Sequence, residues 1–360
     1  MKTFKSLISL LLVLLLAFSF AGCIHKQNEI AVEIGDVKFT AAQYSYALLM
    51  ADSEAQEIVN EQLTEEGIDP TVTAVDIYAR KINDLDYVTW VENRAVELLG
   101  EYAAYQKLFS GADLKLSDET VKNNKDYSDY YYSYYQALYE ANGIGKDTYA
   151  KMVTFDSYAN DYFNHLYGKE GTKAISAEDI NKAFTDSYRV VLVLQTNVTE
   201  MEEEDAKAAK ADLEKYKSRL EKGESVVKVY NEFNGLDEKT AETGNAPAEK
   251  EVDVVSVLAD PEFDESYGVD FWKDIKDVAA GKATVLDAEE NGSKFTRLIY
   301  VLKIKDGDTT FVDEMDASIR WTLKGDDFEK EISDYAKGLT VVKHKYAMSA
   351  FKVKKINYGV

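Results

Sequence analysis

The chain opens with an almost unbroken apolar run over residues 7–20, which follows Lys2 and Lys5. A transmembrane helix needs about twenty apolar residues, so this run is short for a membrane span. A positive start, an apolar middle and small residues at the end are typical of an export signal. We therefore expect residues 1–22 to be a cleaved signal peptide that belongs to no fold.

A polar tether over residues 23–29 leads to the first ordered segment. Over residues 30–39, apolar residues alternate with others on both sides of a Gly-Asp turn, which predicts a short pair of strands. Thr40 and Gln43 have the spacing of a capping box, so we expect a helix to begin there and run to the region of Glu61.

Further helices are predicted where apolar residues recur at three- and four-residue spacings. The first covers residues 74–109. The second is capped by Ser117 and continues to an Asn-Gly pair at residues 142–143. A third is expected to be capped by Asp147 and to end near residue 167, and a short fourth begins after Ser176.

The character of the chain changes at Tyr188, where strands and helices begin to alternate. The predicted order is strand 190–194, helices 201–222 and 225–233, strand 252–258, helix 270–280, and strands 284–286 and 295–304. Asn291 and Gly292 join the last two strands and are typical of a hairpin turn. From Phe311 the pattern returns to helix, and residues 341–356 show no clear pattern.

Composition narrows the classes of function. The 360 residues carry 42 Lys and Arg against 65 Asp and Glu, a net charge of −23, which argues against a nucleic-acid partner because a phosphate backbone needs a basic face. A single Cys excludes an intrachain disulfide and a Cys-based zinc site. Three scattered His disfavour a His-based metal site, so we expect no metal and no cofactor.

The single cysteine, Cys23, directly follows the sequence Phe20-Ala21-Gly22. Small residues just before a Cys resemble a bacterial lipobox, where a lipoprotein signal is cleaved and the Cys is lipidated. The resemblance implies that Cys23 carries acyl chains, and two or three such chains hold a protein stably on a membrane. The alternative is an uncleaved N-terminal anchor.

Three segments of the mature chain resemble SurA/PrsA-type foldases. They are residues 32–40 ahead of a helix, residues 104–121 at a junction between helices, and residues 175–184. The element order of residues 188–305 resembles a parvulin-type peptidyl-prolyl isomerase, and residues 276–285 and then 295–303 resemble its last helix and closing hairpin.

The resemblance implies an α+β fold. Residues 30–187 would form a mainly helical chaperone domain. Residues 188–306 would form a parvulin-like α/β domain, a small antiparallel sheet covered by helices, inserted before the C-terminal helix. Residues 307–360 would be a helical segment that packs back on the chaperone domain.

The catalytic pattern of that family is not matched. Parvulins usually place one His in the first strand and another at the start of the last strand, but here these positions fall near Val191 and Arg297. An acidic residue or Cys usually faces the substrate, and Asp237 is the nearest candidate. The resemblance therefore implies a degenerate isomerase site; an active isomerase with a rebuilt site is the alternative.

Seven tyrosines lie within the thirteen positions from Tyr127 to Tyr139. They cannot all share one face of a helix, so some are exposed or line a groove. Tyrosine offers a large contact area with a polar tip, which suits sequence-tolerant binding of unfolded chains. The candidate client-binding residues are Tyr130, Tyr131, Tyr134 and Tyr135. Packing of these rings into the core is the alternative.

Together these features predict a chaperone or foldase that is lipid-anchored outside the bacterial cytoplasm. Its partners would be unfolded or partly folded exported proteins, which it would bind without using a nucleotide. Its second partner would be the membrane, to which lipidated Cys23 would attach it. Two alternatives stay open: an active peptidyl-prolyl isomerase, and a structural or binding surface lipoprotein that reuses the fold.

Overall fold

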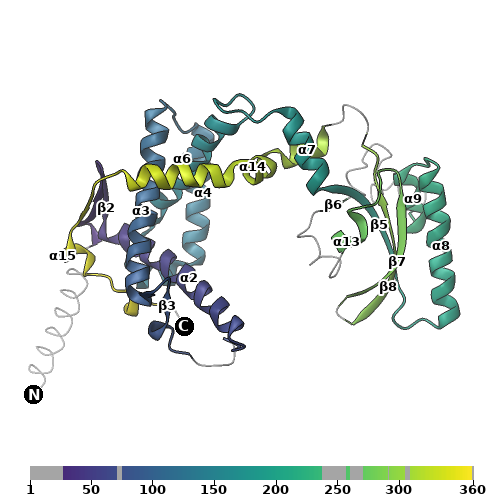
Figure 1. The fold of residues 1–360 in the computed structure, drawn as a ribbon, viewed down its shortest axis with the longest axis horizontal. Helices are drawn as coiled ribbons and strands as arrows, with labels where there is room; N and C mark the ends of the chain where they lie inside the picture. Colours follow the sequence, from purple (N-terminus) through teal and green to yellow (C-terminus); the bar gives the residue numbers. More distant parts are fainter. Residues whose placement is uncertain are drawn as a thin grey trace, which may run out of the picture. The chain divides into compact units, whose positions relative to one another are not determined.

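A computed structural model of the chain describes residues 27–70, 75–236, 257–259, 271–290, 292–304 and 309–358. The chain divides into two compact units (Figure 1). Unit 1 extends to Ala174 and resumes at Lys324, and unit 2 is Ile175–Leu323. Both combine helices with small antiparallel sheets, which confirms the expected α+β class with a mainly helical N-terminal part.

Unit 1 begins with the predicted strand pair. Strands β1 (Ile30–Ile34) and β2 (Val37–Thr40) are antiparallel and turn through Gly35, whose φ of +59° suits glycine. A third strand, β9 (Val341–Lys343), pairs with the other edge of β1. This strand comes from the stretch without a clear sequence pattern, and all three of its residues are exposed.

Helix α2 (Ala41–Glu65) starts at the predicted capping box. The Gln43 backbone N–H donates to Thr40 Oγ1 at 3.3 Å, and the Thr40 N–H donates to Gln43 Oε1 at 3.0 Å. Both otherwise unpaired N–H groups are thereby satisfied, which fixes where the helix begins.

The helix predicted over residues 74–109 is wrong in its first part. Helix α3 covers only Tyr87–Gly111. Three short elements precede it in the described chain: η1 (Ile77–Ala79), β3 (Lys81–Ile82) and β4 (Leu85–Asp86). Asn83 and Asp84 have φ of 50° and 65°, which turns the chain into a hairpin, and Asp86 then caps α3.

The tyrosine-rich stretch forms two helices rather than one. The helices that follow α3 in unit 1 are α4 (Asp118–Tyr134), α5 (Gln136–Ala141) and α6 (Lys146–Tyr167). Ser117 caps α4 as predicted, whereas Tyr135, with φ −105° and ψ 21°, interrupts the helix. Asp147 does not cap α6; Gly145 holds that position and Asp147 lies in the first turn.

The C-terminal tail is bonded back onto unit 1. Helix α14 (Thr310–Lys337) belongs to this unit from Lys324 onward, and α15 (Lys345–Met348) and η2 (Val353–Lys355) follow β9. The Asn142 amide donates to the Asn357 carbonyl at 2.7 Å and accepts the Asn357 N–H at 3.0 Å. This pair of bonds joins residues 215 positions apart.

Unit 2 is built around a four-stranded antiparallel sheet of order β6-β5-β8-β7. Its elements in chain order are α7 (Ala177–Ser187), β5 (Arg189–Asn197), α8 (Glu203–Glu221), α9 (Val226–Phe233), β6 (Val257–Ala259), α13 (Phe271–Ile275), β7 (Ala283–Glu290) and β8 (Ser293–Val301). The elements that the structure describes in this unit follow the predicted order of strands and helices. Helices α8 and α9 cover one face of the sheet and α13 lies on the other (Figure 1).

Unit 2 extends beyond the expected bounds of 188 and 306. Ile180 and Phe184 of α7 pack into the same core as Leu192 of β5, which brings the residues before Tyr188 into this unit. Ile319 of α14 joins that core from the other end. The unit thus closes its apolar face with helices from both flanks of the sheet.

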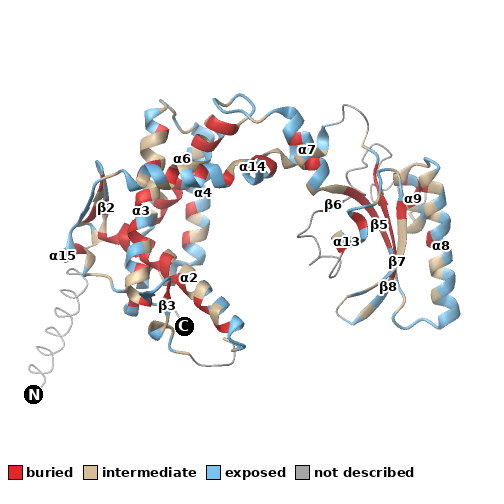
Figure 2. Cartoon of the chain, in the orientation of Figure 1, coloured by how far each residue is buried: buried red, intermediate tan, exposed pale blue. Residues whose placement is uncertain are grey.

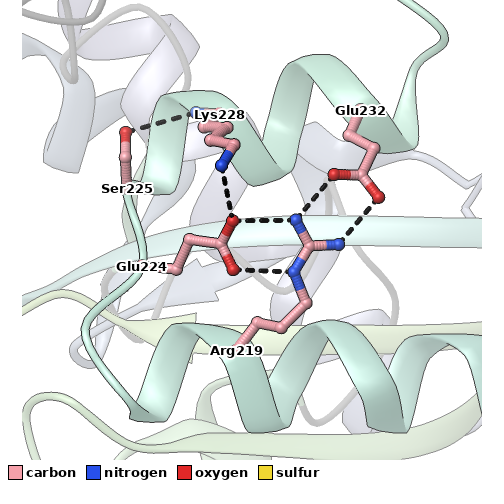
Figure 3. Close-up of polar contacts among 5 residues, drawn as sticks. All are labelled: Arg219, Glu224, Ser225, Lys228 and Glu232. Atoms are coloured by element: carbon pink, nitrogen blue, oxygen red, sulfur yellow. Dashed lines mark hydrogen bonds and ion pairs between the residues drawn. The ribbon is translucent and has the colours of Figure 1, made fainter.

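The turn between α8 and α9 is closed by Arg219 (Figure 3). Its guanidinium donates two hydrogen bonds to Glu224, at 2.8 and 3.0 Å, and two to Glu232, at 2.7 and 2.6 Å. Hydrogen bonds from Arg219 and then from Lys228 lower the pKa of Glu224 to about 2. Paired bidentate contacts of this kind fix geometry as well as charge.

Candidate functional site

The sheet of unit 2 separates two sets of buried side chains. Val190, Leu192 and Leu194 of β5 face the core under α8 and α9. Val191 and Val193 face the opposite side, because side chains alternate along a strand. Arg297 of β8 pairs with Gln195 and therefore lies on the Val191 face.

Val191 has no access to solvent. It packs with Phe271 and Ile275 of α13, Ala259 of β6, and Ile299 of β8. All of these neighbours are apolar, so this position is part of a hydrophobic core and offers no polar group to a substrate amide.

Arg297 is also buried, with 1% of its surface exposed. Its Nε and Nη2 donate to Gln195 Oε1 at 3.1 and 2.9 Å, and Nη2 also contacts the Glu290 carboxylate. The guanidinium lies 5.7 Å from the centre of the Phe271 ring. Because Arg297 is enclosed by these partners, it does not present its charge to a ligand.

The structure does not bring the two expected positions together. Val191 pairs with Val301, whereas Arg297 pairs with Gln195, four residues further along β5. At about 3.4 Å per residue, this separates them by about 13 Å along the strand. The sequence did not identify Gln195 and Glu290 as partners of Arg297, since only strand register brings them together.

Two expected site residues, Cys23 and Asp237, lie outside the described residues. No His occurs between Ile175 and Leu323, so no imidazole belongs to unit 2. Among the described segments, no helix has the length and apolarity needed to span a bilayer.

The tyrosines of unit 1 form an inner and an outer group. Tyr132, Tyr139 and Tyr149 are buried, with ring centroids 4.7–6.2 Å apart. Most of α4 is exposed; only Ser128 and Tyr132 are buried on it (Figure 2). The inner rings anchor α4 and α5 on α6 and leave the outer rings available to solvent.

The outer tyrosines define what we name the aromatic surface. Its members are partly or fully exposed tyrosines of α2, α3 and the α4–α5 region: Tyr46, Tyr102, Tyr105, Tyr127, Tyr130, Tyr131, Tyr134 and Tyr135. Tyr130 and Tyr134 are 64% and 72% exposed. Ring contacts of 4.3 Å between Tyr127 and Tyr131, and of 4.7 Å between Tyr134 and Tyr135, hold neighbouring rings together.

The four tyrosines expected to contact clients therefore lie at the surface. Tyr130, Tyr134 and Tyr135 are exposed, and Tyr131 is partly buried between the rings of Tyr127 and Tyr130. The sequence did not identify the tyrosines that α2 and α3 add, because they are far from the Tyr127–Tyr139 cluster in the sequence.

Asp156 lies on α6, the helix against which α3 and α4 pack. Its side chain is exposed, yet protein atoms crowd it enough that desolvation raises its pKa to about 6. Burial raises the pKa of several tyrosines around it, and the Asp156 carboxylate raises each further: Tyr46, Tyr102, Tyr105, Tyr127 and Tyr149. The carboxylate is thus within electrostatic reach of phenols from α2, α3, α4 and α6.

Comparisons with known proteins give the following. Neither a protein-family model nor a curated protein matches the chain. Among solved structures, the foldase protein PrsA from Streptococcus pneumoniae matches at 14% identity and a TM-score of 0.35, over 73% of this chain and 92% of that one. The foldase protein PrsA from Lactococcus lactis matches at 13% identity and a TM-score of 0.38, over 91% of this chain and 99% of that one. These are foldases of the kind that the sequence resembles, but likeness at this level assigns no function.

Proposed function

We propose that the protein is a chaperone that holds unfolded polypeptide on the aromatic surface of unit 1. The observation that carries this proposal is the group of exposed tyrosines on and beside α4, which is backed by the buried rings of Tyr132, Tyr139 and Tyr149. Exposed aromatic rings at this density are uncommon on a soluble surface and mark interaction sites. The rings are large and stiff, so they gain contact area at low entropic cost.

The proposal gives the binding surface a specific chemistry. Phenol rings contact apolar and aromatic side chains through their faces and donate hydrogen bonds through their hydroxyls. A surface of this kind binds many sequences weakly, because no pocket demands one side chain. That property suits a chaperone more than a receptor for one folded partner.

An aggregation assay tests this function. We expect the full mature chain to suppress aggregation of a reduced, unfolded client protein. Replacing both Tyr130 and Tyr134 with Ala should raise the concentration needed for half-suppression about fivefold, since each ring contributes about 0.5–1.5 kcal/mol.

Tyr346→Ala is the matched control. Tyr346 is 67% exposed and belongs to unit 1, but it lies on α15 outside the aromatic surface. Equal losses in the control and the double variant would point to general surface stickiness. If the wild-type chain does not suppress aggregation of the client, the chaperone function is wrong and a structural lipoprotein is favoured.

We further propose that unit 2 binds clients without isomerising prolines. Prolyl isomerisation needs an apolar slot and a polar setting that favours the twisted amide. Val191 is an apolar core residue and Arg297 is enclosed by its partners, so neither supplies that polar setting. A protease-coupled assay on Xaa-Pro peptides should show no acceleration; clear acceleration would make the protein an isomerase with a rebuilt site.

The proposed location is the outer side of the bacterial cell membrane, with Cys23 as the lipid anchor. Labelling cells with a fatty-acid analogue should mark the wild-type chain and not Cys23→Ala. Membrane retention of the alanine variant at wild-type levels would favour an uncleaved N-terminal anchor instead.

A further inference from the structure

The C-terminal segment differs in charge from the rest of the chain. Residues 338–360 contain five Lys and no Asp or Glu, whereas the whole chain carries a net charge of −23. All five lysines are exposed: Lys343, Lys345, Lys352, Lys354 and Lys355. Lys354 lies over the Tyr78 ring at 5.4 Å, but the other four form no ion pair with any residue that the structure describes. Their charges are therefore available to a partner outside the chain.

Backbone and side-chain bonds hold this segment on unit 1. Strand β9 pairs with β1, and the His344 N–H donates to the Ala31 carbonyl at 2.8 Å. Helix α15 lies beside β1 at the edge of unit 1 (Figure 1). Further along, the two hydrogen bonds between Asn142 and Asn357 fix the end of the segment. The lysines are thus carried by folded chain with a defined position.

The segment also borders Gln27, the first residue that the structure describes. Both line one cavity of about 510 Å³, to which the segment contributes Phe351, Lys352 and Lys355. Gly143 lines the same cavity, and a methyl group on it would come within 2.7 Å of the Phe351 ring and 3.1 Å of Gln27 Nε2. The start of the described chain and two of the lysines are therefore close neighbours.

The proposed lipid anchor lies a short distance along the chain from this cavity. Cys23 precedes Gln27 by four positions, and an extended residue spans at most about 3.6 Å. The two residues therefore lie within about 14 Å of each other, whatever path the chain takes between them. An acyl chain on Cys23 would hold this side of unit 1 near the bilayer surface.

The exposed side chains on this side suit the surface of an anionic membrane. Val341, Val342 and Tyr346 are 42%, 46% and 67% exposed, and they flank Lys343 and Lys345 in the sequence. Surfaces that bind at the boundary between lipid and water combine lysines with apolar and aromatic side chains. Anionic headgroups attract each lysine that lies close to the bilayer, so the attraction grows with the number of lysines.

The acidic charge of the whole chain does not cancel this attraction. Charges are screened over about 8 Å at physiological salt, so the residues nearest the bilayer decide the interaction. Glu33, beside the segment, is paired with His344 at 2.8 Å and with Lys38 at 3.4 Å. Glu140 lines the cavity and accepts a hydrogen bond from the Gln136 amide at 2.8 Å. The excess of lysine over carboxylate therefore remains on this side.

We propose that this side of unit 1 docks on anionic lipid headgroups. We name it the basic face, and its members are Lys343, Lys345, Lys352, Lys355, Val341, Val342 and Tyr346. The inference rests on the proposed anchor at Cys23 and adds a second membrane contact to it. An acyl anchor alone leaves unit 1 free to tilt on its tether, whereas two contacts orient it.

Lysine labelling on vesicles tests the basic face in the full mature chain. Because Cys23 is the single cysteine, a maleimide lipid couples the chain to a vesicle at the position of the proposed anchor. An amine-reactive reagent and mass spectrometry then report the accessibility of each lysine. On vesicles with about one-third phosphatidylglycerol, the four lysines of the basic face should react about fivefold more slowly than on phosphatidylcholine vesicles.

Lys115 and Lys122 are the internal control. Both are exposed, and they lie just before and within the first turns of α4. That helix is about 25 Å long, and its other end leads through α5 to Gly143 and the cavity. These two lysines should react at the same rate on both kinds of vesicle.

Matched variants test the same contact without an anchor. The mature chain with Cys23→Ala should co-sediment with the phosphatidylglycerol vesicles at about 0.15 M salt and be released at about 1 M, where screening shortens to about 3 Å. Adding Lys352→Gln and Lys355→Gln should weaken this binding about tenfold. Adding Lys115→Gln and Lys122→Gln instead removes the same charge and should weaken it less than about twofold.

Four outcomes would overturn the proposal. They are equal labelling of the basic face on both kinds of vesicle, slowing of Lys115 and Lys122 to the same extent, equal losses in the two variants, and no binding of Cys23→Ala to the vesicles. If soluble polyphosphate protects the four lysines as strongly as vesicles do, the basic face binds a soluble polyanion and not a bilayer.

Failure of the anchor is distinguished by a separate readout. If the fatty-acid analogue does not label Cys23 in cells but Cys23→Ala still binds the vesicles, the anchor is wrong and the basic face stands. If Cys23 is labelled but the vesicles do not protect the basic face, the anchor stands and the basic face is wrong.

Discussion

The two units each place a charged side chain beside aromatic rings, but they treat it in opposite ways. In unit 2, Arg297 lies over Phe271, is enclosed by Gln195 and Glu290, and is cut off from solvent. In unit 1, Asp156 is within electrostatic reach of tyrosines, is exposed, and has no cationic partner among the described residues. A charge whose contacts are complete maintains the fold, whereas a charge without them is available to a ligand.

The largest effect is expected where the charge is most enclosed. Arg297→Met leaves the Glu290 carboxylate, which is 20% exposed, without its cation. Unpairing a buried ion costs about 3–5 kcal/mol, and the partial exposure of Glu290 reduces this to about 2–3 kcal/mol of unfolding free energy. Hydrogen exchange of peptides from β5 and β8 measures the loss in unit 2 separately from unit 1.

The matched control is Lys215→Met, which breaks the exposed pair with Asp212. It should cause no measurable loss of unfolding free energy, because the pair is exposed to solvent. Adding Glu290→Gln to Arg297→Met should recover part of the loss, because the unpaired charge is removed. If Arg297→Met costs no more than Lys215→Met, then Arg297 does not maintain the sheet and the contrast between the units fails.

Asp52 of α2 is an intermediate case. It is fully buried, but neutral donors satisfy it: Tyr87 at 2.9 Å, Tyr358 at 2.6 Å and Gln56 at 2.9 Å. Tyr358→Phe removes one hydrogen bond to a buried carboxylate and should cost about 1–2 kcal/mol, since Tyr358 is itself partly exposed. Urea unfolding of the wild type and the variant measures this loss of unfolding free energy. Tyr134→Phe, which removes the hydroxyl of a side chain that is 72% exposed, should cost nothing measurable. Equal effects would mean that Tyr358 does not hold the tail.

Local sequence signals predicted local structure well. Thr40, Ser117 and Ser176 cap the helices that follow them, and the alternation over residues 30–39 forms the β1–β2 pair. The hairpin before α3 was not predicted, because its apolar residues also fit a helical spacing and its turn depends on two left-handed residues, neither of them glycine.

The site was harder to predict than the fold. Gln195 and Glu290 reach Arg297 only through strand register, which sequence spacing does not reveal. Asp156 did carry a signal: it lies seven residues after Tyr149 and three after Val153, in line with two buried residues of α6, although its own side chain is exposed. An acid on an apolar helical stripe indicates a satisfied buried charge or a binding group, and only tertiary structure distinguishes them.

The smallest expected effect tests whether Asp156 carries a cost in the absence of ligand. An aspartate whose pKa rises from 3.8 to about 6 on folding binds more protons when folded than when unfolded between those values. The free energy of unfolding therefore falls as pH rises through this window and stays lower above it. Asp156→Asn removes that cost, so at about pH 7 the variant should be more stable than wild type. Because the side chain is exposed, the gain should be no more than about 1 kcal/mol.

Urea unfolding at about pH 7 and about pH 5 measures this gain, which should shrink at the lower pH because wild-type Asp156 is then largely protonated in the folded state. Asp126→Asn removes one negative charge from an exposed position on α4 and is the control for charge loss alone. A variant that is less stable than wild type at both pH values would show that Asp156 supports the fold, as Arg297 does. A gain that grows from about pH 5 to about pH 7 would mean that unit 1 retains a charge that destabilises its fold.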